Sequence, residues 1–134
     1  MSKTFKCKKI SKGKVEAEVI VSKDAVCFYL VEPETGVLVE DNHDAKGKDI
    51  SGKILMMPSG KGSSVVQADG LYKLEQHGKA PSGIIVEHAD PVLVSSVIIM
   101  NVPMVHKIDK EFYNTIKSGD KILLDADKGL VTIL

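Results

Sequence analysis

The chain has 134 residues, of which 43% are hydrophobic, so it suits one globular domain and is not expected to be disordered. Its eighteen lysine and arginine residues are balanced by eighteen aspartates and glutamates, and only 4% of the residues are aromatic. Nucleic-acid binding normally requires a basic surface, so this composition predicts a protein without a nucleic-acid partner.

The sequence contains no segment that would span a membrane. The longest apolar run covers residues 91–100 and is interrupted by Ser95 and Ser96. It falls short of the roughly 18–20 residues that cross a bilayer. The N-terminus also lacks the apolar core of a signal peptide. We therefore expect a soluble, cytoplasmic protein with no membrane attachment.

The N-terminal part of the chain, residues 3–31, predicts β-strands. Apolar residues occupy the odd positions from 15 to 21, and charged residues occupy the even positions from 14 to 18. This period of two is typical of a half-buried strand. A turn at 22–24 leads to a second apolar run, 25–31, which we predict to be another strand. Residues 40–52 are polar and predict an excursion on the surface.

The middle of the chain predicts a β-loop-α-β unit. Residues 53–57 and 83–87 are continuous apolar runs, as expected for strands buried on both faces. Residues 64–77 between them predict a helix that Gly78 ends, so the unit should be a right-handed parallel crossover. Gly70 lies inside the helix, where glycine is about 1 kcal/mol less stabilising than alanine. We attribute the glycine at this position to close packing of the helix on the sheet.

The predicted helix has an apolar stripe that should face the core. The stripe consists of Val65, Ala68, Leu71, Tyr72 and Leu74.

The C-terminal part predicts short, well-delimited elements. Asp90-Pro91 combines an N-cap with a proline at the first helical position and should start a helix through about residue 98. A strand at 102–106 and a helix at 110–117 follow. Residues 122–124 and 130–133 flank an Asp-Lys-Gly turn, which predicts a hairpin. Because neither β-rich end could bury a core alone, we expect one mixed α/β domain over residues 1–134.

The strongest chemical signal is the glycine loop between the strand at 53–57 and the helix. It reads Gly60-Lys61-Gly62-Ser63-Ser64. Glycines permit a positive φ and let the backbone approach a ligand, and the free amides at the helix N-terminus favour anions. Serine is also a preferred N-cap, so a purely structural role stays open. The spacing is not that of a P-loop.

Metal ligation by this chain is not predicted. Cys7 and Cys27 are not a close-spaced pair, and two thiols fall short of the usual set for an iron–sulfur cluster. Any cluster would therefore be bound by another chain. The histidines at positions 43, 77, 88 and 106 form no i, i+4 pair, and exposed or hydrogen-bonded roles account for them.

A second candidate group follows the buried strand at 83–87. It consists of Glu87, His88 and Asp90. The carboxyl ends of strands in α/β sheets are where ligands bind, so these residues have a better claim to function than most polar residues.

Six motifs around the glycine loop make the sequence recognisable. They are Gly52-Lys53-Ile54-Leu55, Pro58-Ser59-Gly60-Lys61-Gly62-Ser63-Ser64, Gly78-Lys79-Ala80-Pro81, Gly83-Ile84-Ile85, Ala89-Asp90-Pro91 and Val102-Pro103. Together with Pro33-Glu34-Thr35-Gly36 and His43 upstream, they resemble the small subunit of the aconitase X family. The resemblance covers essentially the whole chain, and residues 52–104 are its most specific part.

This resemblance implies a single swivelling β/β/α domain, like the swivel domain of aconitase, that packs on a larger subunit in a heterodimer. It implies that a 4Fe-4S cluster is bound by the large subunit. An unfused small chain most resembles the archaeal members that dehydrate (R)-5-phosphomevalonate to trans-anhydromevalonate 5-phosphate in isoprenoid synthesis. The chain alone would then be inactive.

The resemblance also implies roles for the glycine loop. Ser63, the first serine of the pair, would be the catalytic base that removes the proton α to the carboxylate. The substrate-binding residues would be Gly60, Lys61, Gly62 and Ser64. Helix amides and a lysine could stabilise the serine alkoxide, while the partner's cluster, as a Lewis acid, would remove the β-hydroxyl.

Other functions stay open at this point. True aconitases have a carboxylate-binding arginine where this chain has Val65, so a tricarboxylate substrate is disfavoured. Another aconitase X-type substrate, such as cis-3-hydroxyproline, fits the same residues. A non-catalytic swivelling binding module is a third interpretation, and related modules of that kind carry a phosphorylated histidine on an exposed loop.

Overall fold

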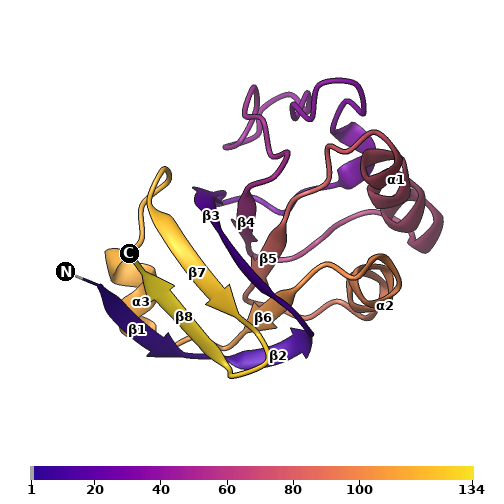
Figure 1. Cartoon of the computed structure of the whole chain (residues 1–134). Helices are drawn as coiled ribbons and strands as arrows, with labels where there is room; N and C mark the ends of the chain where they lie inside the picture. Colours follow the sequence, from indigo (N-terminus) through magenta and orange to yellow (C-terminus); the bar gives the residue numbers. More distant parts are fainter. Residues whose placement is uncertain (1) are drawn as a thin grey trace.

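The computed structural model describes residues 2–134, apart from the side chain of Ser64. These residues form eight strands, three α-helices and one short 3-10 helix (Figure 1). The strands are β1 (Lys3–Lys6), β2 (Lys8–Ser11), β3 (Lys14–Val21), β4 (Ile54–Met57), β5 (Gly83–Val86), β6 (Met104–His106), β7 (Lys121–Asp125) and β8 (Leu130–Ile133). The helices are η1 (Phe28–Leu30), α1 (Ser64–Gln76), α2 (Pro91–Met100) and α3 (Lys110–Thr115).

The strands form one sheet that curves back on itself. Its order is β1-β8-β7-β3-β4-β5-β6-β2. Strands β1 and β2 follow each other directly in the chain, yet β1 pairs with β8 at one edge and β2 pairs with β6 at the other. Between them, the Cys7 amide donates to the Gly129 carbonyl at 2.9 Å. One N-terminal segment therefore joins both edges and nearly closes a barrel (Figure 1).

Four parallel strands, β3 to β6, separate two hydrophobic cores. Side chains alternate along β4, so Leu55 and Met57 pack in the core that contains residues of α1 and α2. Ile54 and Met56 point into the barrel interior instead. Burial on both faces explains the continuous apolar runs, and the predicted β-loop-α-β unit with parallel strands is confirmed.

The barrel interior is completed by α3. Phe112 on this helix is fully buried, and its ring meets that of Phe5 edge to face, with 5.5 Å between centroids and 76° between planes. The predicted C-terminal hairpin is confirmed as β7 and β8, which pair antiparallel.

The strand predicted at 25–31 is wrong. Only isolated bridges form there, Val26 with Gly60 and Val31 with Leu38, and residues between them make η1. The turn of η1 places Phe28 in the core beneath α1, with 1% of its surface exposed. Burying this ring against α1 therefore overrides the local strand propensity.

The excursion predicted at 40–52 also contributes to the core. Its residues Ala45 and Ile50 are buried. His43 is buried too, and its two ring nitrogens bond the backbone: Nε2 lies 2.7 Å from the Ala25 carbonyl, and Nδ1 accepts from the Ala45 amide at 3.0 Å. Accepting at Nδ1 leaves the proton on Nε2 to donate to Ala25. This histidine holds the excursion against the rest of the fold.

The side of α1 that faces the core differs from the prediction. Leu71 and Leu74 are fully buried, as expected, but Val65 is 74% exposed and Tyr72 is 48% exposed. The polar side chain of Gln67 lies inside, with only 2% of the residue exposed. The buried face of α1 is therefore rotated relative to the predicted stripe.

Gly70 allows α1 to pack closely against η1. A Cβ atom at Gly70 would lie 2.5 Å from the Tyr29 nitrogen and 2.6 Å from the Phe28 carbonyl carbon. Backbone atoms cannot rotate away as a side chain can, so no larger residue fits. The attribution of this glycine to helix–sheet packing is corrected accordingly.

Gly70→Ala should destabilise the fold although alanine is the better helix former. The propensity gain is about 1 kcal/mol, and the clash with η1 should exceed it by about 1–3 kcal/mol. Urea unfolding of the Gly70→Ala variant and of the unmodified chain measures the difference in their free energies of unfolding. Glu75→Ala, at an exposed position of the same helix, is the control and should change the free energy of unfolding by less than about 0.5 kcal/mol. If Gly70→Ala unfolds at the same urea concentration as the unmodified chain, or at a higher one, the proposed clash with η1 is contradicted.

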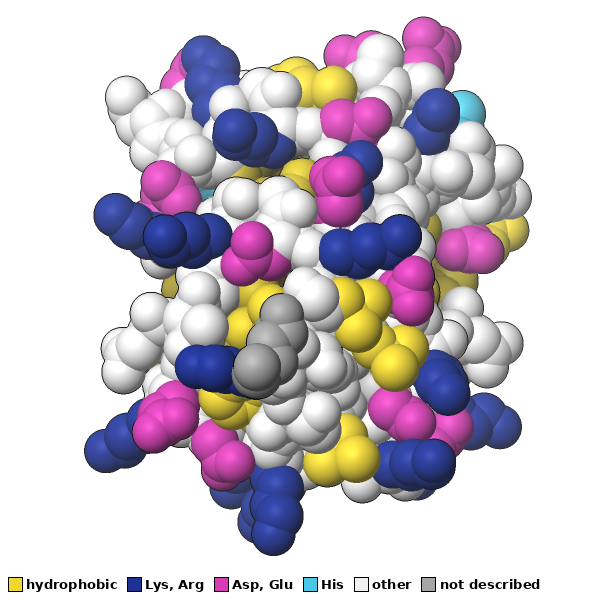
Figure 2. Space-filling view, turned by 60° about the vertical axis from the view of Figure 1, so that its left-hand side comes forward, with side chains coloured by type: hydrophobic (Ala, Val, Ile, Leu, Met, Phe, Trp, Pro, Cys, Tyr) yellow, Lys and Arg dark blue, Asp and Glu magenta, His cyan; other side chains and the backbone are white. Residues whose placement is uncertain are grey.

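Charged side chains of both signs are interspersed on the face of the molecule shown in Figure 2. Lysines lie beside aspartates and glutamates there, and hydrophobic side chains gather in small groups between them. The two signs therefore offset each other locally on this face. Within residues 2–134, none of the helices has both the length and the apolar character needed to cross a membrane.

Candidate functional site

The glycine loop lies at the carboxyl ends of the parallel strands. Gly60 forms a parallel bridge with Val26, and the Lys61 amide donates to the Val26 carbonyl at 3.3 Å. Helix α1 begins directly after the loop, and α2 begins after the neighbouring strand β5 (Figure 1). Two helix N-termini therefore lie at one end of the sheet, where their free amides favour an anionic ligand.

Ser63 is the N-cap of α1. Its backbone is extended (φ −69°, ψ 167°), its Oγ accepts from the Val66 amide at 3.3 Å, and the residue is exposed. The capping role is therefore present, and it leaves the hydroxyl proton and one lone pair free. Ser64 is the first residue of α1, and its side chain lies outside the part of the chain that the structure describes.

Lys61 forms an ion pair with a residue of the excursion. Its Nζ lies 2.5 Å from Oε2 of Glu40, and the two side chains are 42% and 19% exposed. The other carboxylate oxygen of Glu40 is buried, with no hydrogen-bond partner in the described part of the chain. Glu40 thus holds the lysine beside the loop, while part of the lysine side chain stays exposed to a ligand.

The two glycines are needed for different reasons. Gly62 has a φ of +108°, which strains any other residue, and a Cβ there would lie 3.3 Å from Sγ of Cys27. Gly60 does not adopt a positive φ. A Cβ at Gly60 would instead lie 2.5 Å from Oε1 of Gln67. A larger residue at Gly60 would therefore require the Gln67 side chain to move, whereas at Gly62 the backbone conformation itself favours glycine.

The second candidate group lies beside the glycine loop. The amides of Glu87 and His88 both donate to the Pro58 carbonyl, at 3.1 and 2.9 Å, and both residues are exposed. Asp90 caps α2 as predicted, with Oδ1 accepting from the Val92 amide at 3.2 Å. Its other oxygen, Oδ2, accepts from the side chain of the buried Gln67.

Sequence reasoning missed two residues of this region, Glu40 and Gln67. Glu40 is 21 positions away from its partner lysine, so no local pattern could pair them. Gln67 had a signal that was not used, since it stands one helical turn after the N-cap on a face that the fold buries.

The described residues do not fit an iron–sulfur cluster. Within residues 2–134, no group of three or more His, Cys, Asp or Glu could hold a metal ion. Burial, then the charges of Asp125 and Asp109, raise the pKa of Cys7 to about 11. Forming the thiolate that a metal binds is therefore less favourable at Cys7 than at an ordinary cysteine.

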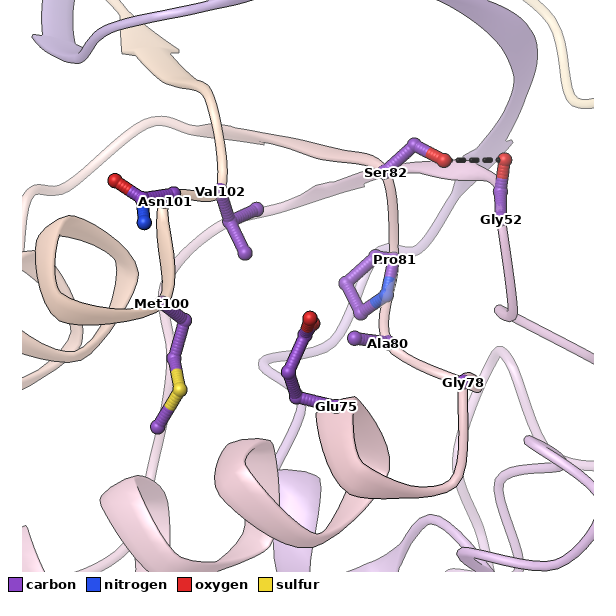
Figure 3. Close-up of a pocket in the computed structure, with 9 residues that line it drawn as sticks. All are labelled: Gly52, Glu75, Gly78, Ala80, Pro81, Ser82, Met100, Asn101 and Val102. Carbon is purple, nitrogen blue, oxygen red and sulfur yellow. Dashed lines mark hydrogen bonds between the residues drawn. The ribbon is translucent and has the colours of Figure 1, made fainter.

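A pocket of about 370 Å³ lies at the opposite end of the parallel strands (Figure 3). It is lined by the last turn of α1 with the loop that follows and by the residues between α2 and β6. The side chain of Glu75 points into it, while Ser82 Oγ donates to the Gly52 carbonyl at 2.8 Å (Figure 3). Helix C-termini and a carboxylate disfavour anions, so this pocket does not suit the anionic ligand expected at the loop.

Comparisons with known proteins agree with this fold. A family model described as the aconitase X swivel domain matches residues 4–133. The phosphomevalonate dehydratase small subunit of Thermococcus kodakarensis is 42% identical over 131 residues, which cover 97% of this chain and 96% of that protein. The protein of the same name from Methanosarcina mazei is 37% identical over 97% of this chain and 90% of its own length.

The solved structures include a close match to the whole chain. The crystal structure of Thermococcus kodakaraensis aconitase X in its holo-form aligns with a TM-score of 0.89 and 41% identity, covering 98% of each chain. The mixed α/β swivelling fold expected from the sequence is thereby confirmed. The chain belongs to the aconitase X swivel domain family.

Proposed function

We propose that this chain is the small subunit of a 4Fe-4S hydro-lyase that dehydrates (R)-5-phosphomevalonate to trans-anhydromevalonate 5-phosphate. The observation that carries the proposal is its identity of 42% and 37%, over nearly the full length of both chains, to two proteins named phosphomevalonate dehydratase small subunit. Such a name requires a large subunit as partner. We place the heterodimer in the mevalonate pathway of isoprenoid synthesis.

Ser63 is the base in this proposal. The reaction removes a proton from the carbon next to the carboxylate and a hydroxyl group from the following carbon, which together leave as water. The proton passes to Ser63 Oγ, which must be an alkoxide to accept it, and the electron pair of the C–H bond forms the double bond as the hydroxyl group departs. Water is complete when the serine gives up this proton again, which restores the alkoxide. Serine is a weak base at its ordinary pKa, so the alkoxide needs stabilisation by neighbouring groups. A positioned general base contributes about 10²–10⁴-fold to the rate.

The surroundings of Ser63 offer that stabilisation. The hydroxyl lies at the N-terminus of α1, whose free amides carry partial positive charge. Lys61 is two positions away and adds a full charge, of which Glu40 offsets part. In a closed interface, where water is excluded, such fixed donors are worth far more than in solvent.

The substrate has a methyl-branched carbon chain, which carries the departing hydroxyl group, between two anionic ends. Gly60, Lys61, Gly62 and the α1 amides suit one of these ends, and we propose them, with Ser64, as its binding residues. Val65 follows at the position where aconitases carry an arginine, and it is 74% exposed. An apolar side chain there suits a methyl-branched carbon chain better than a further carboxylate.

We assign the 4Fe-4S cluster to the large subunit, because the described residues of this chain offer no suitable set of ligands. Each subunit then holds half of the site. Neither should be active alone.

Reconstitution tests the proposal. The chain is mixed with the purified large subunit after its cluster has been assembled, and dehydration of 5-phosphomevalonate is followed by product formation. We expect no turnover from either subunit alone and turnover from the pair, with cis-3-hydroxyproline left unchanged. Turnover of cis-3-hydroxyproline instead would show that it, and not 5-phosphomevalonate, is the substrate. An inactive pair whose large subunit retains its cluster would overturn the proposed function.

A further inference from the structure

The side chain of Gln67 lies between the glycine loop and α2. The residue is 2% exposed, and its backbone amide donates to the Ser63 carbonyl at 2.9 Å, within the first turn of α1. Buried glutamine is uncommon, because both ends of its amide group need partners. Its position one turn after Ser63 directs the side chain toward the start of the neighbouring helix.

Both hydrogens of the Gln67 amide group are used. Nε2 donates to the Gly62 carbonyl at 2.9 Å and to Oδ2 of Asp90 at 2.9 Å. Both partners can only accept, so the orientation of the amide group is settled: turning it over would place an oxygen against two oxygens. A single side chain therefore ties the residue before Ser63 to the N-cap of α2.

The other atom of this amide group also shapes the loop. Oε1 of Gln67 is buried, with no hydrogen-bond partner in the described part of the chain. It lies where a Cβ at Gly60 would come within 2.5 Å. Keeping a buried acceptor without a partner is unfavourable, so the two bonds of Nε2 must outweigh this cost for the side chain to stay inside.

We propose that Gln67 is a positioning residue of the site: its bond to the Gly62 carbonyl fixes the Gly62–Ser63 peptide and thereby the direction of Ser63 Oγ. This inference rests on the proposed function of Ser63 as the base. The bond to Asp90 is a separate link between the helices. A misplacement of the reacting group of about 1 Å can cost about 100-fold in rate, so losing the Gly62 bond should be visible in kcat.

Two variants separate the loop bond from the helix link. Gln67→Met keeps the length of the side chain and removes both bonds. Asp90→Asn keeps a good N-cap for α2 but turns the oxygen that accepts from Gln67 into an amide donor, so it removes the helix link alone. The bond from Gln67 to the Gly62 carbonyl is kept.

Steady-state kinetics of the reconstituted heterodimer and thermal unfolding of the chain are the two measurements. Gln67→Met should lower kcat by about 10- to 100-fold with KM changed less than about threefold, and should lower the midpoint temperature. Asp90→Asn should also lower the midpoint temperature, but should lower kcat much less than Gln67→Met does. Gln76→Met, at an exposed glutamine of the same helix, is the matched control and should change neither. Equal losses of kcat in Gln67→Met and Asp90→Asn would mean that Gln67 serves only to link the two helices and would overturn the inference.

Two further readouts separate this inference from the proposed function. Ser63→Ala is measured alongside: if it keeps turnover, the base assignment fails, whereas a loss in Ser63→Ala with full kcat in Gln67→Met overturns only the role of Gln67. The amide NMR signals of Gly62 and Ser63 in the full chain do not depend on activity. They should shift more in Gln67→Met than in Asp90→Asn, and unchanged loop signals in Gln67→Met would again overturn the inference.

Discussion

Ser63→Ala should lower kcat of the reconstituted pair by about 10³-fold or more, with KM changed little. The proposed base is removed, and alanine has no hydroxyl to take its place. The measurement is steady-state dehydration of 5-phosphomevalonate at saturating large subunit. Because the substrate is bound by other groups of the loop and by the partner, the loss should fall on the chemical step rather than on binding.

The same substitution removes the N-cap of α1, so a control must separate folding from chemistry. Losing the cap should cost about 0.5–2 kcal/mol in the free energy of unfolding. Ser63→Asn keeps a good cap and lacks the hydroxyl. It should unfold in urea at nearly the original midpoint and yet be as inactive as Ser63→Ala. Turnover by Ser63→Asn near that of the unmodified pair would move the base elsewhere.

Lys61→Met should lower kcat/KM by about 100-fold. A fixed donor beside a developing oxyanion is worth about 10²–10³-fold, and Glu40 already offsets part of this charge. Lys46→Met is the matched control, since Lys46 forms a comparable ion pair with Asp41 at 2.7 Å in the same excursion. We expect less than a twofold change in the control. Equal effects of the two substitutions would show that Lys61 acts only through general charge.

Stability must also be separated from activity at Lys61. Removing the lysine leaves the Glu40 carboxylate, which is only 19% exposed, without its cation. The double variant Glu40→Gln with Lys61→Met removes this penalty. It should recover the free energy of unfolding while kcat/KM stays low. Recovery of both would mean that the lysine serves the fold and not the substrate.

The parts of the fold that local patterns control were predictable from sequence. Strands β4 and β5 are apolar on both faces because each separates two cores, and Gly78 ends α1 with a φ of +69°. The segment at 25–31 was not predictable in this way. Its apolar residues suit a strand, but Phe28 gains more by turning into the core beneath α1.

The candidate site also has a part that local sequence patterns predict and a part that depends on distant residues. The glycine loop is contiguous, so sequence predicted it as a unit with a serine as the possible helix cap, and the structure assigns the cap to Ser63. Its supports come from elsewhere in the chain: Glu40 from the excursion, and Gln67 through its bond to Asp90, 23 positions away. The predicted apolar stripe was misleading, because it included Val65, which is exposed, and left out Gln67, which is buried. Because the buried face of α1 was predicted wrongly, sequence reasoning did not identify Gln67, the side chain that we propose positions the loop.

A crystal structure of the heterodimer with bound trans-anhydromevalonate 5-phosphate would test the central claim most directly. The claim is that Ser63 faces the substrate across the interface with the large subunit. We predict that Ser63 Oγ lies about 3–3.5 Å from the carbon next to the carboxylate, with the glycine loop on one anionic end of the product. A product bound out of reach of this hydroxyl, with the glycine loop facing solvent, would contradict the account.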